Sequence, residues 1–75
     1  MTDPITWLWR ALERRYNARR REIDMMILWP ACRQMTDDVD RAKEAFAVHA
    51  FHDAAWLELG NDEIRRRIDA LGREG

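Results

Sequence analysis

The feature that most constrains this chain is a long amphipathic helix pattern in its first half. Apolar residues recur there at helical spacing: Ile5, Leu8, Trp9, Leu12, Tyr16, Ile23, Met26 and Ile27. At about 100° per residue, most of them fall within roughly a quarter of the helix circumference. Such a helix is about 35 Å long, whereas a compact domain of this size has a radius of gyration of about 11 Å. The pattern therefore predicts apolar helix surface that the rest of the chain is too small to cover.

The size of the chain indicates that its fold needs stabilisation beyond a hydrophobic core. Its 75 residues are expected to form a single domain, 1–75, with a thin core. Small domains are usually stabilised by disulfides, a metal or oligomerisation. Cys32 is the only cysteine, so it has no disulfide partner within the chain. A bridge between two chains is an alternative, but a reduced, buried thiol is the commoner state. Oligomerisation is the support that we expect.

The boundary residues predict three to four helices. Asp3 is expected to cap the first helix, 4–28, with Pro4 at its first position. Pro30 disfavours helical geometry at the residue before it, so we expect the helix to end or kink there, with a short helical turn after it. Further helices are expected at 37–52, 54–59 and 62–71, with Asp53 as a cap and Gly60 as a stop.

No segment alternates with the period of a strand, so the predicted fold class is all-α. The long N-terminal amphipathic helix is expected to carry a short helical C-terminal half, packed over the C-terminal part of that helix. The apolar residues expected to face the core are, on the second helix, Val39, Ala42, Phe46, His49 and Ala50 and, on the last, Ile64, Ile68 and Leu71. The predicted assembly is a helical homodimer, with Ile5, Leu8, Leu12 and Tyr16 in the contact.

The segment from Met25 to Cys32 is apolar on all sides of a helix. The favoured interpretation is a helix end buried all round under the later segments. The alternative is an exposed Met-rich surface that grips a partner. The run is too short to cross a bilayer, and the start Thr2-Asp3-Pro4 has no signal-peptide pattern, so we expect a cytoplasmic protein.

Charge is unevenly distributed along the first helix. Between residues 10 and 21 there are six arginines against Glu13 alone: Arg10, Arg14, Arg15, Arg19, Arg20 and Arg21. Arginine binds phosphates and carboxylates bidentately, so the helix suits nucleic acid or an acidic protein surface. The net charge of −1 argues against nucleic acid, because nucleic-acid modules are usually strongly basic. An acidic protein partner or a solvated helix face is the favoured interpretation.

Trp7 and Trp9 lie about 160° apart on a helix, so both cannot face one core. Trp and Arg are enriched in protein-binding hot spots, and the same composition suits an interfacial membrane helix, which we consider less favoured. The predicted partner-binding residues are Trp7, Trp9, Leu12, Arg14, Arg15, Arg19 and Arg20.

The stretch His49-Ala50-Phe51-His52-Asp53 is the one pattern with metal-ligand chemistry. Two histidines three residues apart, with Asp53 and Cys32, contain the residue types of a zinc site. The favoured interpretation is structural, with His49 at the edge of the core and His52 at a helix end. There is no glycine-rich phosphate loop or nucleophile triad, so we predict no enzyme activity, no metal and no cofactor.

The run Ile23 to Cys32, followed by Ala45-Phe46, His49-Ala50, Asp53, Ala55-Trp56 and Leu59-Gly60, resembles small uncharacterised proteins of bacteriophages and prophages of proteobacteria. The resemblance implies an accessory protein that acts by binding, for example by inhibiting or redirecting a host protein. It assigns no role to any residue. The function predicted from the sequence is a small non-catalytic helical interaction module, with a nucleic-acid-binding helical dimer as the alternative.

Overall fold

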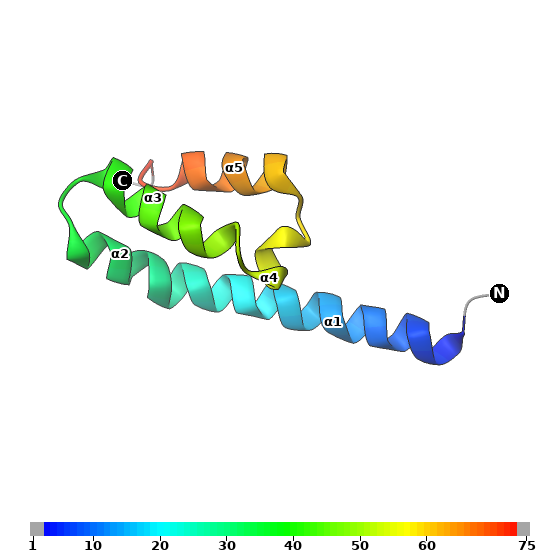
Figure 1. Cartoon of the computed structure of the whole chain (residues 1–75). Helices are drawn as coiled ribbons and strands as arrows, with labels where there is room; N and C mark the ends of the chain where they lie inside the picture. The colour runs from blue at the N-terminus through cyan, green and yellow to red at the C-terminus, as the bar shows by residue number, and fades with distance from the viewer. Residues whose placement is uncertain (1–2, 74–75) are drawn as a thin grey trace.

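The computed structural model describes residues 3–73, and every secondary-structure element in that range is helical (Figure 1). The elements are α1 (Pro4–Ile23), the π-helical segment η1 (Asp24–Leu28), α2 (Trp29–Met35), α3 (Val39–Ala50), α4 (Ala54–Leu57) and α5 (Asn61–Ala70). The predicted all-α class is confirmed for these residues. The predicted domain spans 1–75, and its residues 1–2 and 74–75 lie outside the described range. Thr2, part of the N-terminal segment weighed as a signal peptide, is one of them.

α1, η1 and α2 follow one another without interruption and form a single rod (Figure 1). The predicted boundary at about residue 28 is where η1 gives way to α2, and the short helical turn expected after it is α2, but the helical rod does not end there and continues to Met35. In η1 the backbone N–H of Trp29 donates to the carbonyl of Asp24, five residues back. Pro30 has no N–H, and in an ordinary α-helix its ring crowds the carbonyl four residues earlier. The wider π turn directly before Pro30 makes room for that ring, so the rod passes through the proline.

Local capping fixes where several helices begin. The side chains of three aspartates each accept a hydrogen bond from the backbone N–H two residues later and cap α1, α3 and α4: Asp3, Asp38 and Asp53. The predicted caps at Asp3 and Asp53 are therefore confirmed. Gly60 precedes α5 with φ +86° and ψ 154°, a conformation that only glycine adopts readily.

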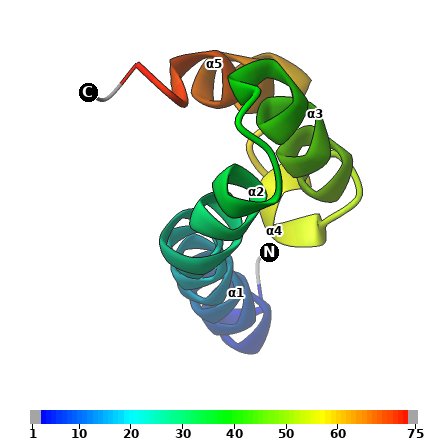
Figure 2. The same ribbon diagram turned by 90° about the vertical axis from the view of Figure 1, so that its left-hand side faces the viewer.

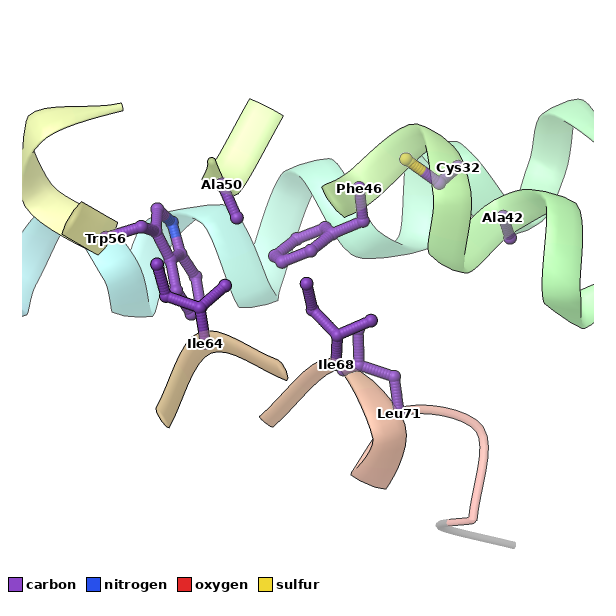
Figure 3. Close-up of a cluster of buried hydrophobic side chains, with 8 residues drawn as sticks. All are labelled: Cys32, Ala42, Phe46, Ala50, Trp56, Ile64, Ile68 and Leu71. Carbon is purple, nitrogen blue, oxygen red and sulfur yellow. The ribbon is translucent and has the colours of Figure 1, made fainter. Parts of the chain in front are cut away.

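The core lies between the rod and the three later helices, which we call the body (α3, α4 and α5). Its largest fully buried side chains are Trp56, Phe46 and Ile64 (Figure 3). The rings of Phe46 and Trp56 pack edge to face, with 5.3 Å between their centroids. Cys32 is buried at the end of the cluster where α2 meets α3. The predicted core positions of α5 are confirmed, and on α3 Ala42, Phe46 and Ala50 are buried whereas Val39 and His49 are half-buried.

The body lies on one side of the rod, as the end-on view shows (Figure 2). It packs along the C-terminal part of the rod as predicted. The favoured prediction for Met25 to Cys32, a helix end buried all round, is wrong, because Met26 is 71% exposed and Ile27 is 67% exposed. The body instead contacts the face that carries Asn17, Arg21 and Asp24, at roughly 140° around the helix from the apolar stripe.

The N-terminal half of α1 extends past the body (Figure 1). The molecule measures 52 × 22 × 22 Å with a radius of gyration of 14.6 Å, well above the value of about 11 Å for a compact chain of this length. None of the described helices combines the length and the apolar character that crossing a bilayer requires.

Candidate interaction surface

The apolar stripe of the rod follows a regular spacing of four and three residues. The positions are Ile5, Trp9, Leu12, Tyr16, Arg19, Ile23 and Met26, which we call the outer seam. Alternating steps of four and three are the heptad repeat of a helix that packs against another helix. Six of the seven positions are large and apolar, and Arg19 is the exception. The seam extends over about 30 Å of the rod.

The outer seam is exposed along its whole length. Its apolar members range from 38% exposure at Ile23 to 71% at Met26. Leu8 and Ile27 flank it and are exposed as well. Single exposed apolar residues are common on proteins, whereas an apolar strip of this length, interrupted by Arg19 alone, is typical of interaction surfaces. The prediction that the chain leaves this stripe uncovered is confirmed for the single molecule.

Four charged residues border the outer seam in the heptad positions that flank a helix–helix contact: Glu13 and Arg20 on one side, and Arg15 and Glu22 on the other. Arg19, within the seam, lies 3.4 Å from Glu22 in an exposed pair one turn away. Each border therefore carries one base and one acid. These residues can distinguish between orientations of a partner helix.

A polar network on the opposite face holds the rod to the body. Asp24 is buried, and its Oδ2 accepts hydrogen bonds from Trp56 Nε1 and His49 Nε2, both at 2.8 Å. Asp53 Oδ2 lies 3.5 Å from the same His49 nitrogen and 3.2 Å from an Nη2 of Arg20. Tyr16, and after it the Asp53 carboxylate, hold the pKa of the Arg20 guanidinium above its ordinary value. The network joins α1 and η1 to α3 and α4.

Asp24, His49 and Asp53 bring three metal-ligating atoms within 4.8 Å of one another. The sequence pattern pointed to a different set, and the structure leaves two of its members out. His52 is exposed, with Nδ1 on the carbonyl of Val48, and Cys32 is buried in the core. Trp56 and Arg20 already donate to the two carboxylates. The arrangement is that of a satisfied hydrogen-bond network, in which carboxylates accept and nitrogens donate.

The structure divides the predicted arginine cluster. Arg21 is engaged internally, because its guanidinium donates to the carbonyl of Ala55 and lies 3.5 Å from Glu58. Arg20 is paired with Asp53, and its side chain stays 42% exposed on the border of the outer seam. Arg14 and Arg15 are exposed, and Arg19 is exposed beside Glu22. The internal pairing of Arg20 and Arg21 weakens the case for a nucleic-acid surface, because a phosphate would compete with the carboxylates that these guanidinium groups already contact.

Trp7 lies off the outer seam and is 67% exposed on the free end of α1. Farther along the rod, a hollow of about 460 Å³ between α1 and α4 is lined by Arg10, Arg14, Leu57 and their neighbours. A second hollow, about 630 Å³, lies between the rod and α5 and is lined largely by apolar residues, among them Met25, Met26 and Leu71. The predicted partner-binding residues therefore fall on two surfaces. Trp9 and Leu12 lie in the outer seam, whereas Trp7 and Arg14 lie on the side of the helix away from it.

Sequence patterns did not reveal Asn17, Asp24 or Glu58 as residues that join the rod to the body. Asn17 is buried and donates to Glu58 at 2.6 Å across the α1–α4 contact. One signal was present in the sequence, because Asp24 is a lone carboxylate beside the apolar run Met25 to Trp29. A buried carboxylate requires hydrogen-bond partners, so its position indicates a polar contact that the apolar pattern does not show.

Comparison with known proteins gives no relative: no protein family, no curated protein and no solved structure matches the chain.

Proposed function

We propose that the protein is a small, non-catalytic helical interaction module that works as a homodimer joined through the outer seam. The supporting observation is that the apolar stripe of the rod is exposed along its length, while the body contacts the face that carries Asn17 and Asp24. Burying one large apolar side chain contributes about 1.5–3 kcal/mol. Several such residues on each chain are enough to offset the entropy lost on association.

The proposal extends to a second partner. Trp7, Arg10 and Arg14 stay outside the outer seam, so a dimer still presents them to solvent. Trp and Arg are the residue types that dominate protein hot spots, and the arginines suit an acidic surface. The resemblance to phage accessory proteins supports a host protein as that target, which the dimer would inhibit or redirect.

Dimerisation is tested by measuring mass in solution. Light scattering at tens of micromolar should give twice the 9.0 kDa chain mass for the wild-type protein. The double variant Leu12→Glu/Ile23→Glu should give the mass of one chain while keeping its helical circular dichroism signal. The matched control Val48→Glu/Leu57→Glu also places two acids on exposed apolar positions, but on the body, and should remain dimeric. A wild-type protein of single-chain mass would contradict the proposal.

The alternative functions predict different results in binding experiments. Nucleic-acid binding predicts that duplex DNA is retarded on a gel, that added salt removes the shift, and that Arg14→Ala/Arg15→Ala abolishes it. Membrane binding predicts that the protein sediments with anionic vesicles. Either result, together with a wild-type protein of single-chain mass, would replace the proposed function.

A further inference from the structure

We propose that the partner seated on the outer seam is a second copy of this chain lying antiparallel to the first, in one register. The inference rests on the proposed homodimer and adds its orientation and its contacts. In this register Leu12 of each copy faces Ile23 of the other, Trp9 faces Met26, and Tyr16 faces Arg19. The two-fold axis passes between residues 17 and 18.

Arg19 argues against a parallel pair. In a parallel pair each seam residue meets its own copy, so two Arg19 guanidinium groups would face each other inside the contact. The flanking position of Arg15 would also meet Arg20 of the other copy, placing like charges together. In the antiparallel register Arg19 meets the ring of Tyr16, an arrangement that supports a cation–π contact.

The border charges select among the antiparallel registers. Flanking residues of the same heptad position face each other in an antiparallel pair. In the proposed register Arg15 faces Glu22 of the second copy, and Glu13 faces Arg20 of the second copy. By symmetry each pair occurs twice, so all four sites join opposite charges. If the contact is moved by one heptad toward the N-terminus of each chain, Arg15 faces Arg15 of the second copy and Glu13 faces Glu13 of the second copy.

The same register also covers the most apolar surface. It pairs the rod from Ile5 at one end to the turn that carries Pro30 at the other, whereas the shifted register pairs the described residues only from Ile5 to Ile23. Exposed ion pairs contribute little free energy, so burial of the seam supplies the affinity. The charged borders supply the orientation, because each wrong arrangement brings like charges together.

The proposed dimer has a consequence for binding. Trp7 lies about ten residues from the two-fold axis on each copy, so the two Trp7 side chains lie roughly 30 Å apart along the rods. Each body contacts the rod face about 140° around the helix from the seam, so the two bodies lie away from the contact between the rods. A dimer of this form presents two equal surfaces to a partner with two-fold symmetry.

Disulfide trapping tests the orientation directly. The background variant Cys32→Ala removes the native thiol, and Leu12→Cys and Ile23→Cys are each added to it singly. We expect that a mixture of the two single variants forms a cross-linked species under mild oxidation, whereas neither variant alone does. Leu12 lies about 16 Å along the axis from its own copy in the proposed register, beyond the reach of a disulfide.

Every other pattern of cross-links contradicts the proposal in a recognisable way. Cross-linking of each variant with itself shows a parallel dimer and leaves the homodimer of the proposed function intact. A dimer by mass without any of these cross-links shows a different register or surface. A protein of single-chain mass overturns the homodimer as well. The background variant alone, measured by light scattering, shows whether Cys32→Ala preserves the assembly.

Charge exchange supplies an independent test. Arg15→Glu should weaken the dimer by placing acids opposite Glu22, and the double variant Arg15→Glu/Glu22→Arg should restore it. The control Arg14→Glu changes the charge by the same amount on the rod face away from the seam, and it should leave the dimer dissociation constant within about threefold. Failure of the double variant to recover more than half of the loss would contradict the register.

Discussion

The indole Nε1 of Trp56 donates a hydrogen bond of 2.8 Å to the carboxylate of Asp24, which lies 32 residues earlier in the π-helical part of the rod. Both side chains are buried, and the same carboxylate oxygen also accepts from His49. This contact joins the rod to the body. It also gives the indole N–H of Trp56, the largest core side chain, a hydrogen-bond acceptor.

Replacing Asp24 should therefore destabilise the protein more than its single charge suggests. Asp24→Ala leaves the buried Trp56 N–H without its acceptor, and an unpaired buried donor costs about 1–3 kcal/mol. Asp24→Asn keeps an oxygen in place and should cost less. Urea unfolding followed by Trp fluorescence measures both, with the exposed acid change Glu44→Ala on α3 as control. Equal stability of Asp24→Ala and the wild-type protein would show that the hydrogen bond does not hold the body.

Gly60 should not tolerate a side chain. Its φ of +86° with ψ of 154° lies in a region that is almost restricted to glycine, and a Cβ built there meets nothing within 4 Å. Gly60→Ala should therefore cost about 1–3 kcal/mol from backbone strain alone. Thermal unfolding by circular dichroism checks this, with Asn61→Ala as control. A melting temperature unchanged within 1 °C would mean that the turn relaxes to another conformation.

Glu63 should titrate at unusually low pH. Arg66, and next Arg67, donate to its carboxylate and lower the pKa of Glu63 to about 2. Because the folded-state pKa lies below the unfolded value of about 4.3, the stabilisation from this group is present above that value. It is lost as the pH falls toward 2. NMR titration of the Glu63 carboxyl carbon measures the pKa, which should return toward its ordinary range in Arg66→Ala/Arg67→Ala.

Cys32 should be unreactive in the folded protein. The side chain is buried against α3, and burial raises the pKa of its thiol above the ordinary value. Since the thiolate is the reactive form, alkylation by iodoacetamide at neutral pH should be slow in buffer and fast in denaturant. Mass spectrometry over time measures the two rates. A disulfide-linked dimer on a non-reducing gel would contradict a buried thiol.

Much of the fold follows from local patterns in the sequence. Aspartates before apolar periodic segments begin α1 and α4, because a short carboxylate accepts the free backbone N–H groups of a helix start. The spacing of Ile64, Ile68 and Leu71 identifies the buried edge of the last segment in the same way. Pro30 lies where η1 gives way to α2, but it does not end the helical rod. The widened turn before it depends on a backbone adjustment that residue propensities do not encode.

The sequence by itself determined that the first helix is long and carries an apolar stripe, since both are properties of residue spacing alone. Only the tertiary structure decided which face of that helix the body covers. The body binds the face with Asn17 and Asp24, where Glu58, His49 and Trp56 satisfy the buried polar groups. Such pairing joins residues 25 to 41 positions apart, and no local pattern specifies it. The exposed seam follows from that choice, because the body is too small to cover two faces of the rod.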